Sequence, residues 1–199
     1  MQIFKKRGII LLLINEAFEG ENMYIWVAID VDEQLNMLRK NAESYVQDKG
    51  LYSPTLTLPF HISLKISFNI SNDIFQGVLD DIRELLKALT PFEIITNDIE
   101  EHDGIIWLTM QDNEWLIYIH NKLDEMLFEK YGVEQHEFDK NFIFHTSILI
   151  LNNEEESKNA FNAIQVIKMP KILKVERFII GSSINGVAGT YSVNEKIEI

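Results

Sequence analysis

Two apolar stretches of this chain each carry a histidine followed two residues later by a serine. The first stretch, 59–68, contains His61 and Ser63, and a second stretch farther along the chain contains His145 and Ser147. Both are rich in β-branched and aromatic residues, which predicts strands. Because residues i and i+2 of a strand point to the same face, each histidine shares a face with its serine, and the alternate apolar residues point to a core.

The surroundings of the two motifs also repeat, which constrains the fold more than either motif does alone. Strands are predicted at 25–29 and at 106–110, each with a tryptophan in second position. Each is followed by acidic or amide capping residues and a helical run, to about Lys49 and Tyr131, and then by a motif strand. We therefore expect two similar lobes that each offer one imidazole and one hydroxyl to a shared cleft.

The rest of the pattern interleaves helices with strands, as in an α+β fold with antiparallel sheets. Asp103-Gly104 and Asn185-Gly186 are turn signals, so hairpins are predicted at both places. Apolar periodicity predicts helices at 35–49, 71–89, 112–131 and 152–167, and strands at 24–30, 59–68, 92–100, 104–110, 142–150, 175–181 and 187–193.

The negative charge and the lack of cysteine limit the functions that this chain can have. The formal net charge is −13, and the sequence has no basic stripe of the kind that meets the phosphates of long duplex or structured RNA. A small anionic substrate needs only a few local donors, so a nucleotide is compatible with this charge. The absence of cysteine excludes disulfides and thiolate chemistry, leaves His, Asp and Glu as the only metal ligands, and favours a reducing cytoplasm.

Residues 1–22 differ in character from the rest. A basic cluster followed by an apolar run at 8–14 resembles the start of a signal peptide, but the run is too short to span a bilayer and no small-residue cleavage site follows. Residues 19–22 can be encoded by purine-rich codons that would form a bacterial ribosome-binding site ahead of Met23. We therefore expect an N-terminal extension at 1–22, with Met23 as a candidate natural start, and a single domain at 23–199.

Two imidazoles facing each other across a cleft can perform concerted acid–base catalysis. Near pH 7 one ring can be neutral and the other protonated, so that one takes a proton from a nucleophile while the other gives a proton to a leaving group. Hydroxyls two residues from the histidines could hold the non-bridging oxygens of a phosphate between the rings. This chemistry fits phosphoester transfer or hydrolysis at a nucleotide 2′-hydroxyl, and it requires no metal or other cofactor.

The paired motifs, each in an apolar strand and placed in two similar halves, resemble the signature of the 2H phosphoesterase superfamily, which is His-x-Thr/Ser-x in two copies. His61-Ile62-Ser63-Leu64 and His145-Thr146-Ser147-Ile148 match it. The superfamily includes bacterial 2′-5′ RNA ligase-like proteins and cyclic nucleotide phosphodiesterases, and the resemblance covers roughly residues 23–199. It implies a bilobal, pseudo-twofold α+β fold with two antiparallel sheets lining a central cleft and helices outside.

The resemblance also implies roles for particular residues. It makes His61 and His145 the acid–base pair, and Ser63 and Ser147 the ligands of the substrate phosphate.

Members of the superfamily commonly add basic or aromatic residues that hold the substrate. Lys65, expected on the same strand face as His61, is the best basic candidate, and Phe60 and Tyr52 are candidates for stacking on a base. In the second motif Leu149 stands where Lys65 stands in the first, which disfavours tight binding of polyanions.

The other histidines are predicted to be solvated surface residues. His102 lies in a predicted turn, and His120 and His136 lie in polar surroundings. His136-Glu137 could suggest metal ligands, but no partner residue has the spacing of a metal site. Core positions are predicted for three tryptophans, Trp26, Trp107 and Trp115.

We weigh three functional hypotheses. The first is an enzyme that opens a 2′,3′-cyclic phosphate, or breaks or joins a 2′-5′ phosphodiester, on a small nucleotide or an RNA end, with no long duplex and no membrane as partner. The second is a protein of the same fold that binds a nucleotide or RNA end without turnover. The third is an unrelated interaction protein whose histidines lie far apart. The sequence leaves open the product isomer, the direction of reaction and which histidine is the base, and a monomer is the simplest expectation.

Overall fold

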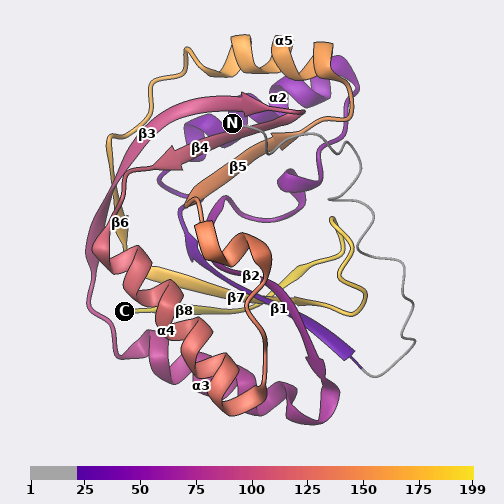
Figure 1. Ribbon diagram of the computed structural model, residues 1–199. Coiled ribbons are helices and arrows are strands. Elements are labelled where there is room, and N and C mark those ends of the chain that lie inside the picture. Colours follow the sequence, from indigo (N-terminus) through magenta and orange to yellow (C-terminus); the bar gives the residue numbers. More distant parts are fainter. Residues whose placement is uncertain (1–21) are drawn as a thin grey trace.

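Eight strands form two antiparallel sheets of four strands each in the computed structural model, which describes residues 22–199 (Figure 1). The order in the first sheet is β2 (His61–Ser71), β1 (Asn22–Asp30), β7 (Arg177–Ser183) and β8 (Ser192–Glu198). The order in the second sheet is β5 (His145–Ile150), β4 (Ile105–Met110), β3 (Phe92–His102) and β6 (Ile172–Val175). The two motif strands, β2 and β5, therefore each form one edge of a sheet.

The part of the chain that the structure describes has four α-helices, and they cover the sheets in two pairs. One pair is α2 (Asn36–Lys49) with α5 (Glu154–Ile164), and the other is α3 (Phe75–Lys87) with α4 (Glu114–Tyr131). Figure 1 shows the two pairs on opposite sides of the molecule, with both sheets between them. The predicted α+β class, with antiparallel sheets and helices outside, is confirmed.

The helices are exchanged between the two halves of the chain. Helix α2 comes from the first half but packs on α5 and on β5 of the second sheet, whereas α4 comes from the second half and packs on α3 and on β2 of the first sheet. A single cluster of buried apolar side chains includes residues from both sheets and from all four of these helices. Separating the lobes would expose this shared core to water, so the two halves stabilise each other.

The connector before the first motif strand contacts the second motif strand. It contains the 3₁₀ segment η1 (Pro54–Thr57), in which the Thr55 hydroxyl donates to the Ile148 carbonyl of β5 at 2.8 Å. The N–H of Ile150 donates to Ser53 Oγ at 2.8 Å. These bonds satisfy backbone groups on the open edge of β5, which would otherwise be left without a sheet partner.

The connector before the second motif strand contacts the first motif strand in return. It contains the 3₁₀ segment η3 (Glu137–Asn141), whose Asp139 carboxylate accepts from the Lys65 ammonium of β2. A further 3₁₀ turn, η2 (Asn72–Ile74), leads from β2 into α3. Each motif strand is thus held by the connector that precedes the other, which fixes the two motifs relative to one another.

One strand prediction needs correction, one strand was not predicted, and one turn prediction is confirmed. The Asp103-Gly104 turn joins β3 to β4, and its φ angles of 49° and 92° suit a two-residue hairpin. The Asn185-Gly186 turn is instead part of a loop at 184–191, so β8 begins at Ser192 rather than at 187. The Asn185 carboxamide oxygen accepts from the hydroxyls of Ser183 at 3.0 Å and Thr190 at 2.6 Å, which closes a wider loop. Strand β6 was not predicted, because its alternation is too short to stand out.

The predicted extension at 1–22 lies outside the described residues, except for Asn22, which begins β1. Among the helices of residues 22–199, none has the length and apolar character needed to cross a membrane.

Candidate active site

The two motif histidines are anchored in the same way. His61 Nδ1 lies 2.8 Å from the Pro59 carbonyl oxygen, and His145 Nδ1 lies 2.7 Å from the Ile143 carbonyl oxygen. A carbonyl oxygen only accepts hydrogen bonds, so Nδ1 carries the proton in each neutral ring and Nε2 is the basic nitrogen. Within residues 22–199 neither Nε2 has a hydrogen-bond partner. Both rings therefore keep one nitrogen available for proton exchange with a substrate.

A tryptophan on the neighbouring strand packs against each imidazole. Trp26 of β1 contacts His61, and Trp107 of β4 contacts His145, with ring centroids 4.6 Å apart in both pairs. The sequence repeat contains both tryptophans but does not show that they support the histidines. Trp26 is buried, as predicted, whereas Trp115 is 47% exposed on α4, so its predicted core position was wrong.

Gly181 of β7 makes room for the Trp26 indole. A Cβ at this position would lie 2.3 Å from Trp26 Nε1 and 2.6 Å from the Ser192 carbonyl oxygen, distances that real side chains do not adopt. We expect Gly181→Ala to destabilise the fold by about 1–3 kcal/mol, since overpacking displaces the indole.

A matched control for that substitution lies in helix α3. A Cβ at Gly77 would meet only the Tyr131 hydroxyl, at 3.6 Å, so Gly77→Ala should stabilise the protein by about 0.5–1 kcal/mol through helix propensity. Urea unfolding of both variants measures the two effects. Equal stability of Gly181→Ala and the parent protein would contradict the tight packing of Trp26 on β7.

The motif serines lie where the strand pattern predicts. Ser63 pairs with Ala28 of β1, and Ser147 pairs with Trp107 of β4. Both are partly exposed and are flanked by fully buried neighbours, so they occupy the same strand face as their histidines. Each imidazole therefore has one hydroxyl two residues away on its own strand.

The two imidazoles influence each other electrostatically. Strands β2 and β5 contact one another, and charge on His145 contributes to lowering the pKa of His61. Burial is the main cause that lowers the pKa of His61, and the Pro59 carbonyl and two nearby carboxylates, Asp30 and Asp32, oppose it. Burial likewise lowers the pKa of His145, against the opposing effect of its bond to the Ile143 carbonyl. Both rings are therefore neutral more often near pH 7 than a solvated histidine.

Lys65 does not share the face of His61, contrary to the sequence interpretation. Val27 pairs with Lys65 and Ala28 pairs with Ser63, so two steps along β2 match one step along β1. This bulge turns Lys65 into the interior, where it is 2% exposed and forms ion pairs with Asp124 and Asp139. An ammonium group buried in this way is not available to a substrate phosphate.

The two aromatic candidates differ in their placement. Phe60 is 1% exposed and lies beneath the Arg39 guanidinium, 5.4 Å from the ring centroid, so it cannot stack on a base and that prediction is corrected. Tyr52 is 69% exposed, and its hydroxyl lies next to Gly189 in the loop between β7 and β8. Leu149, which occupies the position corresponding to Lys65 in the second motif, is fully buried.

The predicted surface histidines also differ from one another. His102 is exposed, is paired with Glu100 at 2.8 Å, and lies 5.3 Å from the Trp107 ring. His136 caps η3, where its ring accepts from the Phe138 N–H. His120 is only 4% exposed, so its predicted surface position was wrong. The helical spacing of its apolar neighbours on α4 could have predicted that His120 is buried. These buried neighbours are Leu116, Ile119, Leu123 and Leu127.

Each of the two similar sheets thus carries one motif histidine and one motif serine on an edge strand. Residues 48–183 match the family model described as the 2′-5′ RNA ligase superfamily. The match covers more than half of the chain, so this protein belongs to the 2′-5′ RNA ligase superfamily, the group of 2H phosphoesterases that its motifs resemble. Membership supports phosphoesterase-type chemistry.

Individual relatives are distant in sequence and similar in fold. A Bacillus licheniformis protein named "Putative phosphoesterase" is 23% identical over 145 residues, which are 71% of this chain and 80% of that protein. A solved structure from Thermus thermophilus has a TM-score of 0.59 at 15% identity and covers 88% of this chain and 97% of its own. LigT of Escherichia coli, solved with 3′-AMP, has a TM-score of 0.56 at 16% identity over 90% of this chain and 99% of LigT. These structural similarities show a common fold.

Proposed function

We propose that this protein is a phosphoesterase that opens a 2′,3′-cyclic phosphate, or cleaves or joins a 2′-5′ phosphodiester, on a small nucleotide or an RNA end. The observation that carries the proposal is the matched anchoring of His61 and His145. Each ring has its Nδ1 proton fixed by a backbone carbonyl and its Nε2 free within the described residues, and each lies two residues from a serine hydroxyl.

Hydrolysis of a cyclic phosphate by this pair requires two proton transfers. The neutral histidine takes a proton through Nε2 from a water molecule, whose oxygen forms the new bond to phosphorus. The bond from phosphorus to one ribose oxygen breaks, and the protonated histidine gives its Nε2 proton to that oxygen. The pair ends with the opposite protonation, and one proton exchange with solvent restores it. The serine hydroxyls donate to the non-bridging oxygens, on which negative charge increases in the transition state.

The residues around the motifs favour a small substrate. Two buried carboxylates balance the charge of Lys65 in the interior, so it does not attract a substrate. The chain also has a net charge of −13, so a long polyanion would meet repulsion. Tyr52, exposed in the connector that precedes β2, is the candidate for contact with a base. LigT, which has the same fold, holds a nucleoside monophosphate in its solved structure, and this supports a ligand of similar size here.

The direct test is hydrolysis of the four nucleoside 2′,3′-cyclic monophosphates in EDTA, with the product isomer identified by chromatography. Turnover in EDTA supports the two-histidine chemistry, and the isomer shows which phosphorus–oxygen bond breaks. Without turnover, a 2′-5′-linked dinucleotide and an ADP-ribose cyclic phosphate are the next substrates. Saturable quenching of tryptophan fluorescence with no product from any of these would favour a binding protein of the same fold.

The pH dependence follows from the lowered pKa of both histidines. The active form carries one proton on the pair, so its population peaks between the two pKa values of the free enzyme. Because both values lie below the ordinary value of about 6.5, kcat/KM should peak on the acidic side of pH 6.5 and fall about tenfold per pH unit on the alkaline limb. A bound phosphate favours protonated rings, so the profile of kcat should lie at higher pH than that of kcat/KM. Initial rates from pH 4.5 to 9 measure both curves, and a kcat/KM maximum well above pH 7 would contradict the burial effect.

A further inference from the structure

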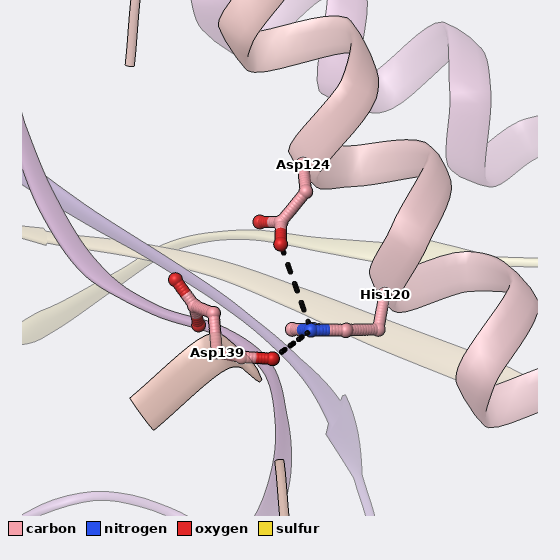
Figure 2. Close-up of side chains that lie close together, drawn as sticks. All are labelled: His120, Asp124 and Asp139. Carbon is pink, nitrogen blue, oxygen red and sulfur yellow. Dashed lines mark hydrogen bonds and ion pairs between the residues drawn. The ribbon is translucent and has the colours of Figure 1, made fainter. Parts of the chain in front are cut away.

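A buried histidine outside the motifs lies between the first motif strand and the segment that leads into the second. His120 is on α4, with Asp124 one turn farther along the same helix and Asp139 on the opposite side of its ring, as Figure 2 shows. Its Nδ1 lies 2.7 Å from the Leu64 carbonyl oxygen, and its Nε2 lies 3.2 Å from the Asp139 carbonyl oxygen and 3.6 Å from Asp124 Oδ2.

The contacts of His120 reach both motifs. Leu64, whose carbonyl oxygen faces Nδ1, directly follows Ser63 in the first motif. On the other side the imidazole packs against Phe142 with ring centroids 4.6 Å apart, and edge-on against Phe144 at 6.1 Å. Phe144 directly precedes His145. The imidazole therefore contacts residues adjacent in sequence to a motif serine and to a motif histidine.

The charged groups around His120 hold it in place. Lys65 Nζ lies 2.7 Å from Asp124 Oδ1 and also pairs with the Asp139 carboxylate, and all three side chains are buried. Asp139 accepts from the His136 N–H at 2.9 Å, and Asp124 accepts from Gln135 Nε2 at 2.8 Å. The network thus joins β2, α4 and η3.

The same residues could be interpreted as a metal site, but the position of Lys65 disfavours that interpretation. One ligand atom each from His120, Asp124 and Asp139 lies within 4.8 Å of the others. However, the Lys65 ammonium already pairs with both carboxylates, so it takes the place that a cation would occupy. A divalent ion would have to displace a buried ammonium, or lie beside it against like-charge repulsion.

We propose that His120 is a positioning residue that sets the first motif strand and the second motif strand at the separation needed for the reaction. This inference rests on the proposed function for its effect on rate. The hydrogen bond to Leu64 fixes β2 next to Ser63, and the aromatic contacts fix the chain next to His145. A misplacement of about 1 Å between reacting groups can lower a rate about 100-fold.

Two substitutions separate the two kinds of contact. His120→Phe keeps a ring against Phe142 and Phe144 but loses the bond to Leu64, whereas His120→Asn keeps a donor near the Nδ1 position and loses most of the ring. We expect each to lower kcat by roughly 10- to 100-fold at a temperature where the protein is fully folded, with a smaller change in KM. The control is Arg83→Met, which breaks the 2.7 Å ion pair with Glu195 between α3 and β8 and should leave kcat unchanged.

NMR of the histidine rings provides a readout that does not depend on activity. His120→Phe should shift the ring signals of His61, His120→Asn should shift those of His145, and Arg83→Met should shift neither. These shifts would support the positioning role even if no phosphoester is turned over, in which case only the proposed function fails. Unchanged kcat and unchanged ring signals in folded His120 variants would overturn it. So would stoichiometric binding of Zn²⁺ by the parent protein that Asp124→Asn abolishes, since His120 would then be a metal ligand.

Discussion

Replacing either His61 or His145 with alanine is expected to lower kcat for a 2′,3′-cyclic nucleotide by roughly 10²–10⁴-fold, the usual contribution of one well-placed acid or base. Both rings keep only Nε2 for proton transfer, because backbone carbonyls hold Nδ1. The double variant should be little slower than either single variant, because two groups that act in one step contribute as a unit. Steady-state rates at matched protein concentration measure all three.

The control for these substitutions is His102→Ala. His102 is exposed and paired with Glu100. His102→Ala also removes one imidazole, but it should change kcat by less than twofold. An aryl phosphodiester with a weakly basic leaving group would assign the roles, since its departure needs no proton. The variant that regains activity on this ester lacks the general acid. Two alanine variants that both retain most of the parent activity would exclude the two-histidine mechanism.

The motif strands and their face pattern could be predicted from the sequence because strand periodicity is a local property. His61 and Ser63 share a face whatever their strand packs against, and so do His145 and Ser147. The near-repeat of strand, helix and motif strand was enough to predict two matched lobes.

The position of Lys65 could not be predicted, because it depends on the neighbouring strand. The bulge in β2 is defined by its register against β1, in which Val27 pairs with Lys65 and Ala28 with Ser63. Strict alternation would place Lys65 beside His61, and a bulge is what turns it to the other face. No residue within β2 predicts the bulge from the sequence alone.

The exchange of helices between lobes explains why His120 was also misplaced. Helix α4 follows the second tryptophan strand in sequence, yet it packs beneath the first sheet, so its polar residues meet partners from β2 and η3. A histidine with an aspartate one turn later is usually a solvated pair on a helix surface. Here the pair is buried because Lys65 turns toward it from another lobe.

Replacing Lys65 with methionine is expected to destabilise the protein by about 3–5 kcal/mol, the cost of removing one partner of a buried ion pair. Methionine fills a similar volume, so the loss comes from two buried carboxylates, Asp124 and Asp139, left without their cation. Urea unfolding at pH 7 measures the change, and Lys122→Met is the matched control. Lys122 pairs with Glu125 on the exposed side of α4, where water screens the pair, so its loss should lower stability far less than Lys65→Met does.

A second substitution shows whether the destabilisation comes from charge or from packing. Adding Asp124→Leu to Lys65→Met removes one uncompensated carboxylate, so the double variant should regain part of the stability that the single variant loses. If packing were the cause, the second large substitution would add to the loss. A cost for Lys65→Met as small as that for Lys122→Met would mean that water reaches the network, and a solvated network could not hold η3 against β2 at a fixed distance.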